Sequence, residues 1–208
     1  MLVLKLCKQF CPEKIPVIPA TKLGDGADGE VFEIKDQSDL VIKFCVLYET
    51  GPVRVQRSFK NVKKVLEYLQ ANPLPIYARV ISFGMLGQFE RETARKKPQP
   101  FILYYYIMEK LQKITEDERK VFHSIISHED RGIIKNYPAS KIQEMLEGMR
   151  TGLDFDMERV TFFCNKLRNV SVVHRDIHVR NIMKDCTGNF KLIDFDRAQL
   201  MENGNAKK

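Results

Sequence analysis

The chain has 208 residues, of which 44% are hydrophobic, so it can bury one core or two small lobes that share a cleft. Its net charge of +7 suits acidic partners such as a nucleotide, an acidic protein surface or anionic lipid headgroups. No apolar stretch has the length of a membrane span, and the apolar run at residues 1–7 is too short for a secretory signal. We therefore expect no membrane span and no general secretion.

The cysteines are odd in number and scattered along the chain, and no two pairs are spaced as in a zinc site. They are Cys7, Cys11, Cys45, Cys164 and Cys186. This usage indicates reduced thiols in a cytosol-like compartment.

Three glycines mark the first predicted hairpin. They stand at Gly24, Gly26 and Gly29 and are followed by residues 30–34, which alternate like a strand. Glycine is needed where the backbone approaches phosphate closely and takes dihedrals that a Cβ forbids. A dinucleotide-binding turn would instead continue as a helix, so the pattern favours a nucleotide-binding hairpin, with an ordinary hairpin as the alternative.

Lys43 interrupts the apolar strand predicted over residues 41–44. It is either a phosphate ligand or a solvated edge-strand lysine. The next element is a helix over 55–70, ended by the prolines that follow Asn72. Basic residues at helical spacing predict its solvated side: Arg54, Arg57, Lys60, Lys63 and Lys64. Glu67 on the same helix either pairs with Lys43 or makes a surface pair with Lys63.

Two neighbouring strands are predicted over residues 76–83 and 101–108. The segment 87–100 between them has the character of a long charged loop, with Arg91, Arg95, Lys96 and Lys97. A solvated insertion is favoured over a substrate contact. Because aromatic residues that could stack on bases are absent there, we do not expect a nucleic-acid partner.

Helices follow a short connecting segment at 108–111. Residues 115–118 form a capping-box sequence that opens one helix, and residues 140–143 open another. A third is predicted over 155–169, with an apolar stripe that indicates core packing rather than a cofactor site. It leads directly to the most informative part of the chain.

That part is His174-Arg175-Asp176-Ile177-His178-Val179-Arg180-Asn181, followed by Lys191-Leu192-Ile193-Asp194-Phe195-Asp196. Apolar runs at 170–173 and 190–193 predict short buried strands that fix these polar groups. Phosphoryl transfer needs one carboxylate to receive a hydroxyl proton, and an amide oxygen and a second carboxylate to hold magnesium. Asp176, Asn181 and Asp194 have those side chains, and His174 is interpreted as a core histidine that orients the loop.

These motifs, in this order and spacing, resemble the protein-kinase-like superfamily. The resemblance implies an α+β, two-lobed fold with an antiparallel-sheet N-lobe over about 17–110 and a reduced helical C-lobe over about 111–208. It implies an ATP- and Mg²⁺-dependent kinase with Asp176 as the catalytic base and Asn181 and Asp194 as metal ligands. Lys43 would contact the phosphates, His178 would approach the transferred phosphoryl group, and the adenine would bind at Glu109 and Leu111. The hairpin residues expected at the nucleotide are Gly24, Asp25, Gly26, Ala27, Gly29 and Val31.

The chain departs from ordinary protein kinases at two places. It stops fourteen residues after Asp194, without room for an activation loop. In ordinary protein kinases the arginine at the position of Arg175 pairs with a phosphorylated activation loop. We therefore expect an enzyme that is active without activation-loop phosphorylation. The alternative is that Arg175 is part of the packing scaffold. Asp196 replaces the usual glycine, and aspartate tolerates the left-handed dihedrals of that turn. The Ile193–Ala198 segment also resembles small-molecule kinases, including lipopolysaccharide-sugar kinases.

The favoured function is a protein kinase with a mild preference for serine or threonine. Its architecture resembles minimal effector kinases that bacterial pathogens inject into host cells, with the HopBF-type family nearest, and this resemblance implies a large heat-shock chaperone of the host as substrate. We expect a cytoplasmic monomer, or an effector delivered without a conventional signal. A sugar kinase and a pseudokinase binding module remain the alternatives, although a pseudokinase would have lost Lys43, Asp176 or Asp194.

Overall fold

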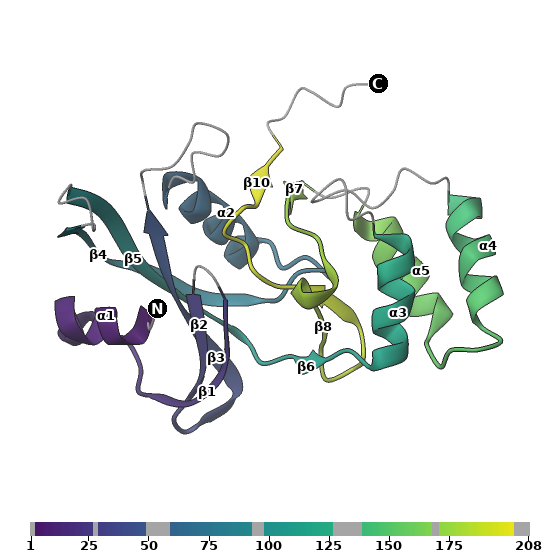
Figure 1. Cartoon of the computed structure of the whole chain (residues 1–208), viewed down its shortest axis with the longest axis horizontal. Helices are drawn as coiled ribbons and strands as arrows, with labels where there is room; N and C mark the ends of the chain where they lie inside the picture. The colour runs from purple at the N-terminus through teal and green to yellow at the C-terminus, as the bar shows by residue number, and fades with distance from the viewer. Residues whose placement is uncertain are drawn as a thin grey trace. The chain divides into compact units, whose positions relative to one another are not determined.

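A computed structural model describes residues 3–26, 29–48, 59–92, 98–126, 139–167 and 171–201. The chain divides into two compact units (Figure 1). The first consists of Met1–Pro73 and Arg79–Lys110, and the second of Leu74–Ala78 and Leu111–Lys208. The first unit is built on an antiparallel sheet and the second is mainly helical, so the predicted α+β class is confirmed.

The first unit contains a five-stranded antiparallel sheet with the order β1-β2-β3-β5-β4. Its strands are β1 (Pro19–Asp25), β2 (Gly29–Ile34), β3 (Gln37–Tyr48), β4 (Val80–Glu92) and β5 (Pro98–Glu109). The glycine-containing turn therefore connects β1 to β2, and Lys43 lies on the central strand β3, as the sequence predicted. A central position excludes the edge-strand alternative for this lysine.

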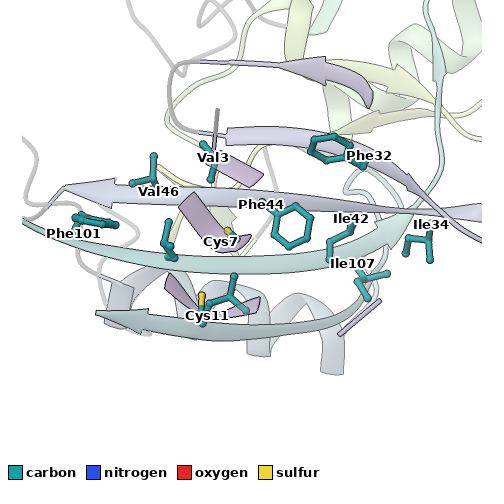
Figure 2. Close-up of a cluster of buried hydrophobic side chains, with 12 residues drawn as sticks. Val3, Cys7, Cys11, Phe32, Ile34, Ile42, Phe44, Val46, Phe101 and Ile107 are labelled. Carbon is teal, nitrogen blue, oxygen red and sulfur yellow. The ribbon is translucent and has the colours of Figure 1, made fainter. Parts of the chain in front are cut away.

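One face of the sheet is covered by α1 (Val3–Phe10), which the 3₁₀ helix η1 (Pro12–Lys14) follows. Alternate residues of β3 point to this side, because successive side chains of a strand face opposite ways. Figure 2 shows Cys7 of α1 beside Phe44 of the sheet, in a cluster that includes Val3 and Cys11. The spacing of Val3 and Cys7 places them on one side of the helix, and Cys11 follows directly after its last residue.

The other face of the sheet carries α2 (Phe59–Ala71), whose buried residues recur at helical spacing. They are Val62, Val65, Leu66 and Leu69. At the start of the helix the ring of Phe59 lies 5.4 Å from that of Tyr104, which pairs with Cys45 of β3. The predicted end of this helix before Asn72 is confirmed, and its predicted start at Val55 lies outside the described residues.

The prediction of a long charged loop over residues 87–100 is wrong for most of its length. β4 continues to Glu92 and β5 begins at Pro98, with Gln88 paired to Ile102 and Glu90 to Pro100. The charged composition suggested a loop, but β4 is an edge strand, where charged side chains can face water. The cations Arg95, Lys96 and Lys97 lie outside the described residues. The predicted strand at 76–83 also begins late, because Ile76–Ala78 belongs to the second unit.

The helices of the second unit are α3 (Glu116–Ile125), α4 (Ala139–Met149) and α5 (Met157–Leu167). The predicted capping box is present: the backbone N–H of Glu118 donates to the Thr115 hydroxyl and that of Thr115 to the Glu118 carboxylate. Phe122 of α3 and Phe163 of α5 pack edge-to-face on each other and on Phe190. Among the described residues, none of the helices is both long and apolar enough to traverse a bilayer.

Short strands complete the second unit. They are β6 (Gln112–Lys113), β7 (Val172–Val173), β8 (Ile182–Lys184), β9 (Phe190–Leu192) and β10 (Gln199–Leu200), with the 3₁₀ helix η2 (Val179–Asn181) before β8. β8 lies between β6 and β9, and β10 pairs with β7. The predicted strands at 170–173 and 190–193 thus correspond to β7 and β9, and they flank the two polar motifs.

Candidate active site

The predicted catalytic motif, residues 174–181, forms a compact loop that follows β7 and ends in η2. The side-chain amide nitrogen of Asn181 donates to the backbone carbonyl of Asp176 at 3.0 Å, and the backbone N–H of Asn181 donates to the carbonyl of His178 at 2.9 Å. Asn181 is only 5% exposed. A buried amide with these bonds has one orientation, so Asn181 closes the loop that presents Asp176.

Two hydrogen bonds join this loop to the segment that carries Asp194. The backbone N–H of Ile193 donates to the carbonyl of Asn181 at 3.0 Å, and the His174 ring lies 2.8 Å through Nε2 from the carbonyl of Ile193. Burial lowers the pKa of His174, so its ring is neutral. Because a carbonyl only accepts, Nε2 carries the ring proton. His174 therefore orients the site, as the sequence suggested.

Aromatic rings lie around His174. The ring of Tyr77 is stacked on His174 at 6.3 Å, and Phe195, which is fully buried, lies 6.0 Å from Tyr77. The Tyr77 hydroxyl donates to the carbonyl of Val172 at 2.8 Å, and burial raises the pKa of this tyrosine. The residue after Asp194 is thus anchored in the core of the second unit.

Strained backbone marks both motifs. Arg175 and Asp194 have positive φ angles of 61° and 69°, a region that costs a residue other than glycine about 1–2 kcal/mol. Such residues concentrate at functional sites. Asp196 is not in this region, so the expectation of left-handed dihedrals at the position of the usual glycine is wrong. Arg175 is exposed, which excludes its interpretation as packing scaffold.

An imidazole and a guanidinium flank the Asp176 carboxylate. Nε2 of His178 lies 3.8 Å from Oδ2, and Nη1 of Arg197 lies 3.6 Å from Oδ1. Sequence reasoning identified His178 but missed Arg197. Arg197 reaches Asp176 because residues 195–198 form a tight turn, in which the N–H of Ala198 donates to the carbonyl of Phe195 at 3.0 Å. In the sequence, only the place of Arg197 directly after Asp196 could have indicated that it reaches the site.

The side chains of Asn181 and Asp194 fit Mg²⁺ by their chemistry, because both present oxygen. The amide nitrogen of Asn181 makes the bond to Asp176, so its oxygen is not consumed there. No group of three or more His, Cys, Asp or Glu side chains within the described ranges could hold a metal alone. Mg²⁺ commonly binds one or two protein side chains together with substrate phosphates, so these two residues suffice when a nucleotide supplies the remaining oxygens.

In the first unit, Lys43 is packed beneath the glycine hairpin. It is 7% exposed, its Nζ lies 5.6 Å from the centre of the Tyr106 ring, and Gly29 lies above its side chain. A Cβ on Gly29 would come within 2.7 Å of the Phe44 carbonyl oxygen and 2.9 Å of Cε of Lys43. Only a residue without a Cβ at position 29 leaves the space that the Lys43 side chain occupies.

The described glycines of the hairpin have no positive φ angle. Among the described glycines only Gly188 has a positive φ, so the prediction that Gly24, Gly26 and Gly29 need dihedrals forbidden to other residues is wrong. The turn is closed by a bond of 2.9 Å from the Gly26 N–H to the Gly29 carbonyl. Asp25 is exposed at the end of β1, Val31 pairs with Lys43 in the sheet, and Ala27 lies outside the described residues.

Glu67 makes the surface pair that the sequence offered as one alternative. Its carboxylate lies 3.6 Å from Nζ of Lys63, and both side chains are about half exposed, at 52% and 53%. Glu67 therefore stands on the solvated side of α2.

The segment predicted to bind adenine begins at the end of β5. The backbone N–H groups of Glu109 and Lys110 donate to the carbonyls of Arg79 at 3.1 Å and Asp39 at 2.7 Å. The Glu109 carboxylate in turn accepts from the backbone N–H of Arg79 at 2.7 Å, so both N–H groups and this side chain are engaged within the first unit. Lys110 is the last residue of the first unit, and Leu111, half-buried, is the first residue of this part of the second unit.

No protein-family model matches the chain. One solved structure similar to it is the co-crystal structure of WbdD and the kinase inhibitor LY294002, with 16% sequence identity and a TM-score of 0.44. The match covers 88% of this chain and 33% of the WbdD chain, so this chain spans about a third of the length of that protein. The function of this chain is therefore inferred from its own residues.

Proposed function

We propose that this chain is an ATP- and Mg²⁺-dependent phosphotransferase of the kinase-like type, with a serine or threonine hydroxyl of a protein as acceptor. The observation that carries the proposal is the closed pair of motifs in the second unit. There Asn181 bonds to Asp176 through its side chain and to Ile193 through its carbonyl, directly before Asp194. A carboxylate, an amide and a second carboxylate fixed in this way are the groups that phosphoryl transfer requires.

In the proposed mechanism, Lys43 and the backbone N–H groups of the glycine hairpin bind the phosphates of ATP. Packing beneath Gly29 fixes the stem of Lys43, so little side-chain entropy is lost when its ammonium group binds an anion. Positioning of this kind supplies much of the rate enhancement in reactions that need little covalent chemistry.

Asp176 orients the acceptor hydroxyl and receives its proton. The bond between the acceptor oxygen and the γ-phosphorus forms as the bond from phosphorus to the leaving ADP oxygen breaks, and the hydroxyl proton passes to the Asp176 carboxylate. His178 and Arg197 flank the two carboxylate oxygens and limit the directions in which they point. Bound Mg²⁺, held by Asn181 and Asp194, would neutralise the phosphate charge that develops.

The protein acceptor is supported by the sequence resemblance to protein kinases. His178 stands where serine/threonine enzymes usually have lysine and Arg180 where tyrosine enzymes often have arginine, so serine or threonine is a mild preference. The resemblance to HopBF-type effectors makes the large heat-shock chaperone of a host cell the first protein substrate to test. Delivery into a host cell and a monomeric state belong to the same proposal.

A small-molecule acceptor is the second candidate, favoured by the placement of Arg197. A guanidinium 3.6 Å from the catalytic carboxylate can bind an anionic group carried by a small acceptor, such as an acidic sugar. The segment Ile193–Ala198 also resembles the metal loop of small-molecule kinases, including lipopolysaccharide-sugar kinases.

The test is ATP consumption by the purified chain in Mg²⁺, compared with the Asp194→Ala variant. We expect consumption by the natural chain and none by the variant. Equal consumption by both would remove Asp194 from the mechanism, and none by either would favour a binding module. Labelled ATP with host lysate, with the purified chaperone and with lipopolysaccharide sugars then identifies the acceptor by mass spectrometry.

A further inference from the structure

Glu30 is a buried carboxylate at the base of the glycine hairpin. It is the residue after Gly29 in β2 and is only 1% exposed. Strand alternation directs its side chain to the face of the sheet that α1 covers, the side on which Phe32 and Ile34 join the core cluster (Figure 2). An ionised group in such a place is costly unless it is paired and hydrogen-bonded.

Both oxygens of this carboxylate have partners on other elements. Oε2 accepts from the backbone N–H of Leu4 at 2.8 Å, and Oε1 accepts from Nζ of Lys22 at 2.8 Å. Nζ of Lys22 also lies 3.2 Å from the carboxylate of Asp25. Glu30 therefore connects the first turn of α1, the strand β1 and the start of β2.

The bond to Leu4 places a negative charge at the N-terminus of α1. The first N–H groups of a helix have no partner within the helix, and α1 has no acidic residue in its own first turn. Burial is the main cause that raises the pKa of Cys7 to about 12, and the nearby charge of Glu30 also contributes. Glu30 thus supplies from β2 the acceptor that α1 lacks.

The same bonds fix the hairpin where its ladder is irregular. The pairing of β1 with β2 changes register on both sides of Lys22, so backbone pairing alone specifies the hairpin weakly there. Lys22 pairs with Phe32 in the ladder, yet its ammonium group reaches back to Glu30 beside the turn. The bond between Lys22 and Glu30 therefore fixes the position of the hairpin where the register of the two strands changes.

We propose that Glu30 is a positioning residue, which sets the phosphate-binding hairpin by joining it to α1 and Lys22. The proposal rests on the proposed function and extends it, because it makes α1 part of the nucleotide-binding apparatus. Glu30 itself touches neither nucleotide nor acceptor in this account. Its loss should weaken nucleotide binding and leave the chemical step almost unchanged.

The main test is the Glu30→Gln variant, which keeps the shape of the side chain and removes its charge. We expect KM for ATP and the Kd of a non-hydrolysable ATP analogue to rise roughly tenfold, the scale of one charge-assisted hydrogen bond. We expect kcat to change less than about twofold, since the groups at the acceptor are untouched. The Leu4 amide should become less protected from hydrogen exchange, because glutamine keeps one neutral acceptor oxygen for the two donors, Leu4 and Lys22.

Glu118 offers a matched control in the second unit. It is also buried, accepts from the Thr115 N–H at 2.7 Å at the start of a helix, and pairs with Lys184 at 2.9 Å. Glu118→Gln should lower the melting temperature about as much as Glu30→Gln does. It should leave the Kd of the analogue within about twofold of the value for the natural chain.

Three outcomes decide the matter. A Kd that rises no more in Glu30→Gln than in Glu118→Gln would overturn the positioning role while the proposed function stands. If the natural chain binds no ATP analogue, the proposed function is lost and this inference with it. If Glu30→Gln does not fold, Lys22→Gln replaces it: a Kd raised about threefold supports the role, and an unchanged Kd refutes it.

Discussion

Lys43 in the first unit is positioned by side-chain volume and strand alternation, whereas Asp176 and Asp194 in the second unit are positioned by backbone hydrogen bonds. Above Lys43 there is no room for a Cβ on Gly29, although none of the described hairpin glycines has a positive φ. The loops that carry the two aspartates include left-handed residues and are fastened by bonds through Asn181 and His174.

This difference separates two kinds of sensitivity. The first unit should respond to small changes of side-chain size or charge near the hairpin, because its ladder there is irregular. The second unit should respond to changes in the groups that fasten its loops, and its strained backbone indicates conformations retained for function rather than for stability.

The largest effect is expected for Asp176→Asn, which keeps the shape of the loop and removes the proton acceptor. We expect kcat to fall by about 100- to 10,000-fold with little change in KM for ATP. Steady-state kinetics measures both.

Asp185→Asn is the control, since this carboxylate binds Thr187 and Asn189 in the turn from β8 to β9 and pairs with Lys191 at 3.5 Å. It should lower stability and spare kcat. A similar fall of kcat in both variants would mean that the Asp176 effect is structural.

Gly29→Ala tests the importance of volume in the first unit. The added Cβ would meet the Phe44 carbonyl and the Lys43 side chain, so we expect Lys43 to be displaced and KM for ATP to rise roughly tenfold. Overpacking should also lower the free energy of unfolding by about 1–3 kcal/mol.

For comparison, Gly148→Ala in α4 adds a methyl group with no atom within 4 Å and should raise helix stability. Unaltered ATP binding in Gly29→Ala would contradict the packing argument.

His174 predicts a pH dependence of stability. Its pKa is lowered from the ordinary value of 6.5 in the folded chain by burial, so below that pH the unfolded chain binds more protons. The contribution of His174 to the free energy of unfolding should therefore be constant above about pH 6.5. It should decrease as the pH falls from 6.5 toward the pKa of His174 in the folded chain. Urea unfolding between about pH 5 and 8 measures this.

The His174→Gln variant should be less stable at neutral pH and should lose this part of the pH dependence. An identical slope in the variant would assign the effect to other groups.

The smallest expected effect is that of Arg175→Gly, which removes strain at a positive φ of 61°. We expect unfolding free energy to rise by up to about 1 kcal/mol, since glycine adopts this region without steric cost but has a more flexible unfolded state. Asp36→Gly, at a φ of 62° in the β2–β3 turn, should raise the unfolding free energy by a similar amount. Destabilisation by Arg175→Gly would mean that contacts of the arginine outweigh the strain.

Local patterns predicted most of the elements and both polar motifs. The alternation of residues 30–34 and the capping box at Thr115 needed no tertiary information, because each is a short-range signal. The charged stretch at 87–92 was mistaken for a loop because pairing with β5 outweighed its composition. Helix α1 was missed, although Val3, Cys7 and Cys11 have helical spacing.

Residues whose roles depend on distant partners could not be found in this way. Glu30 looked like one more residue of an alternating strand, and only the fold brings it to Leu4 and Lys22. Arg197 required the turn at residues 195–198. A left-handed residue was expected at Asp196 by resemblance, whereas the structure has the positive φ at Asp194, directly after Ile193, whose backbone is bonded to Asn181 and His174.

The most direct test of the central claim is calorimetric binding of ATP with and without Mg²⁺ to the natural chain and to Asp194→Asn. Lys43 and the hairpin should give both proteins the same affinity for ATP without the metal. Mg²⁺ should tighten binding to the natural chain, and this gain should be lost in the variant, because one of its two metal ligands has lost its charge. An equal gain from Mg²⁺ in both proteins would contradict the account.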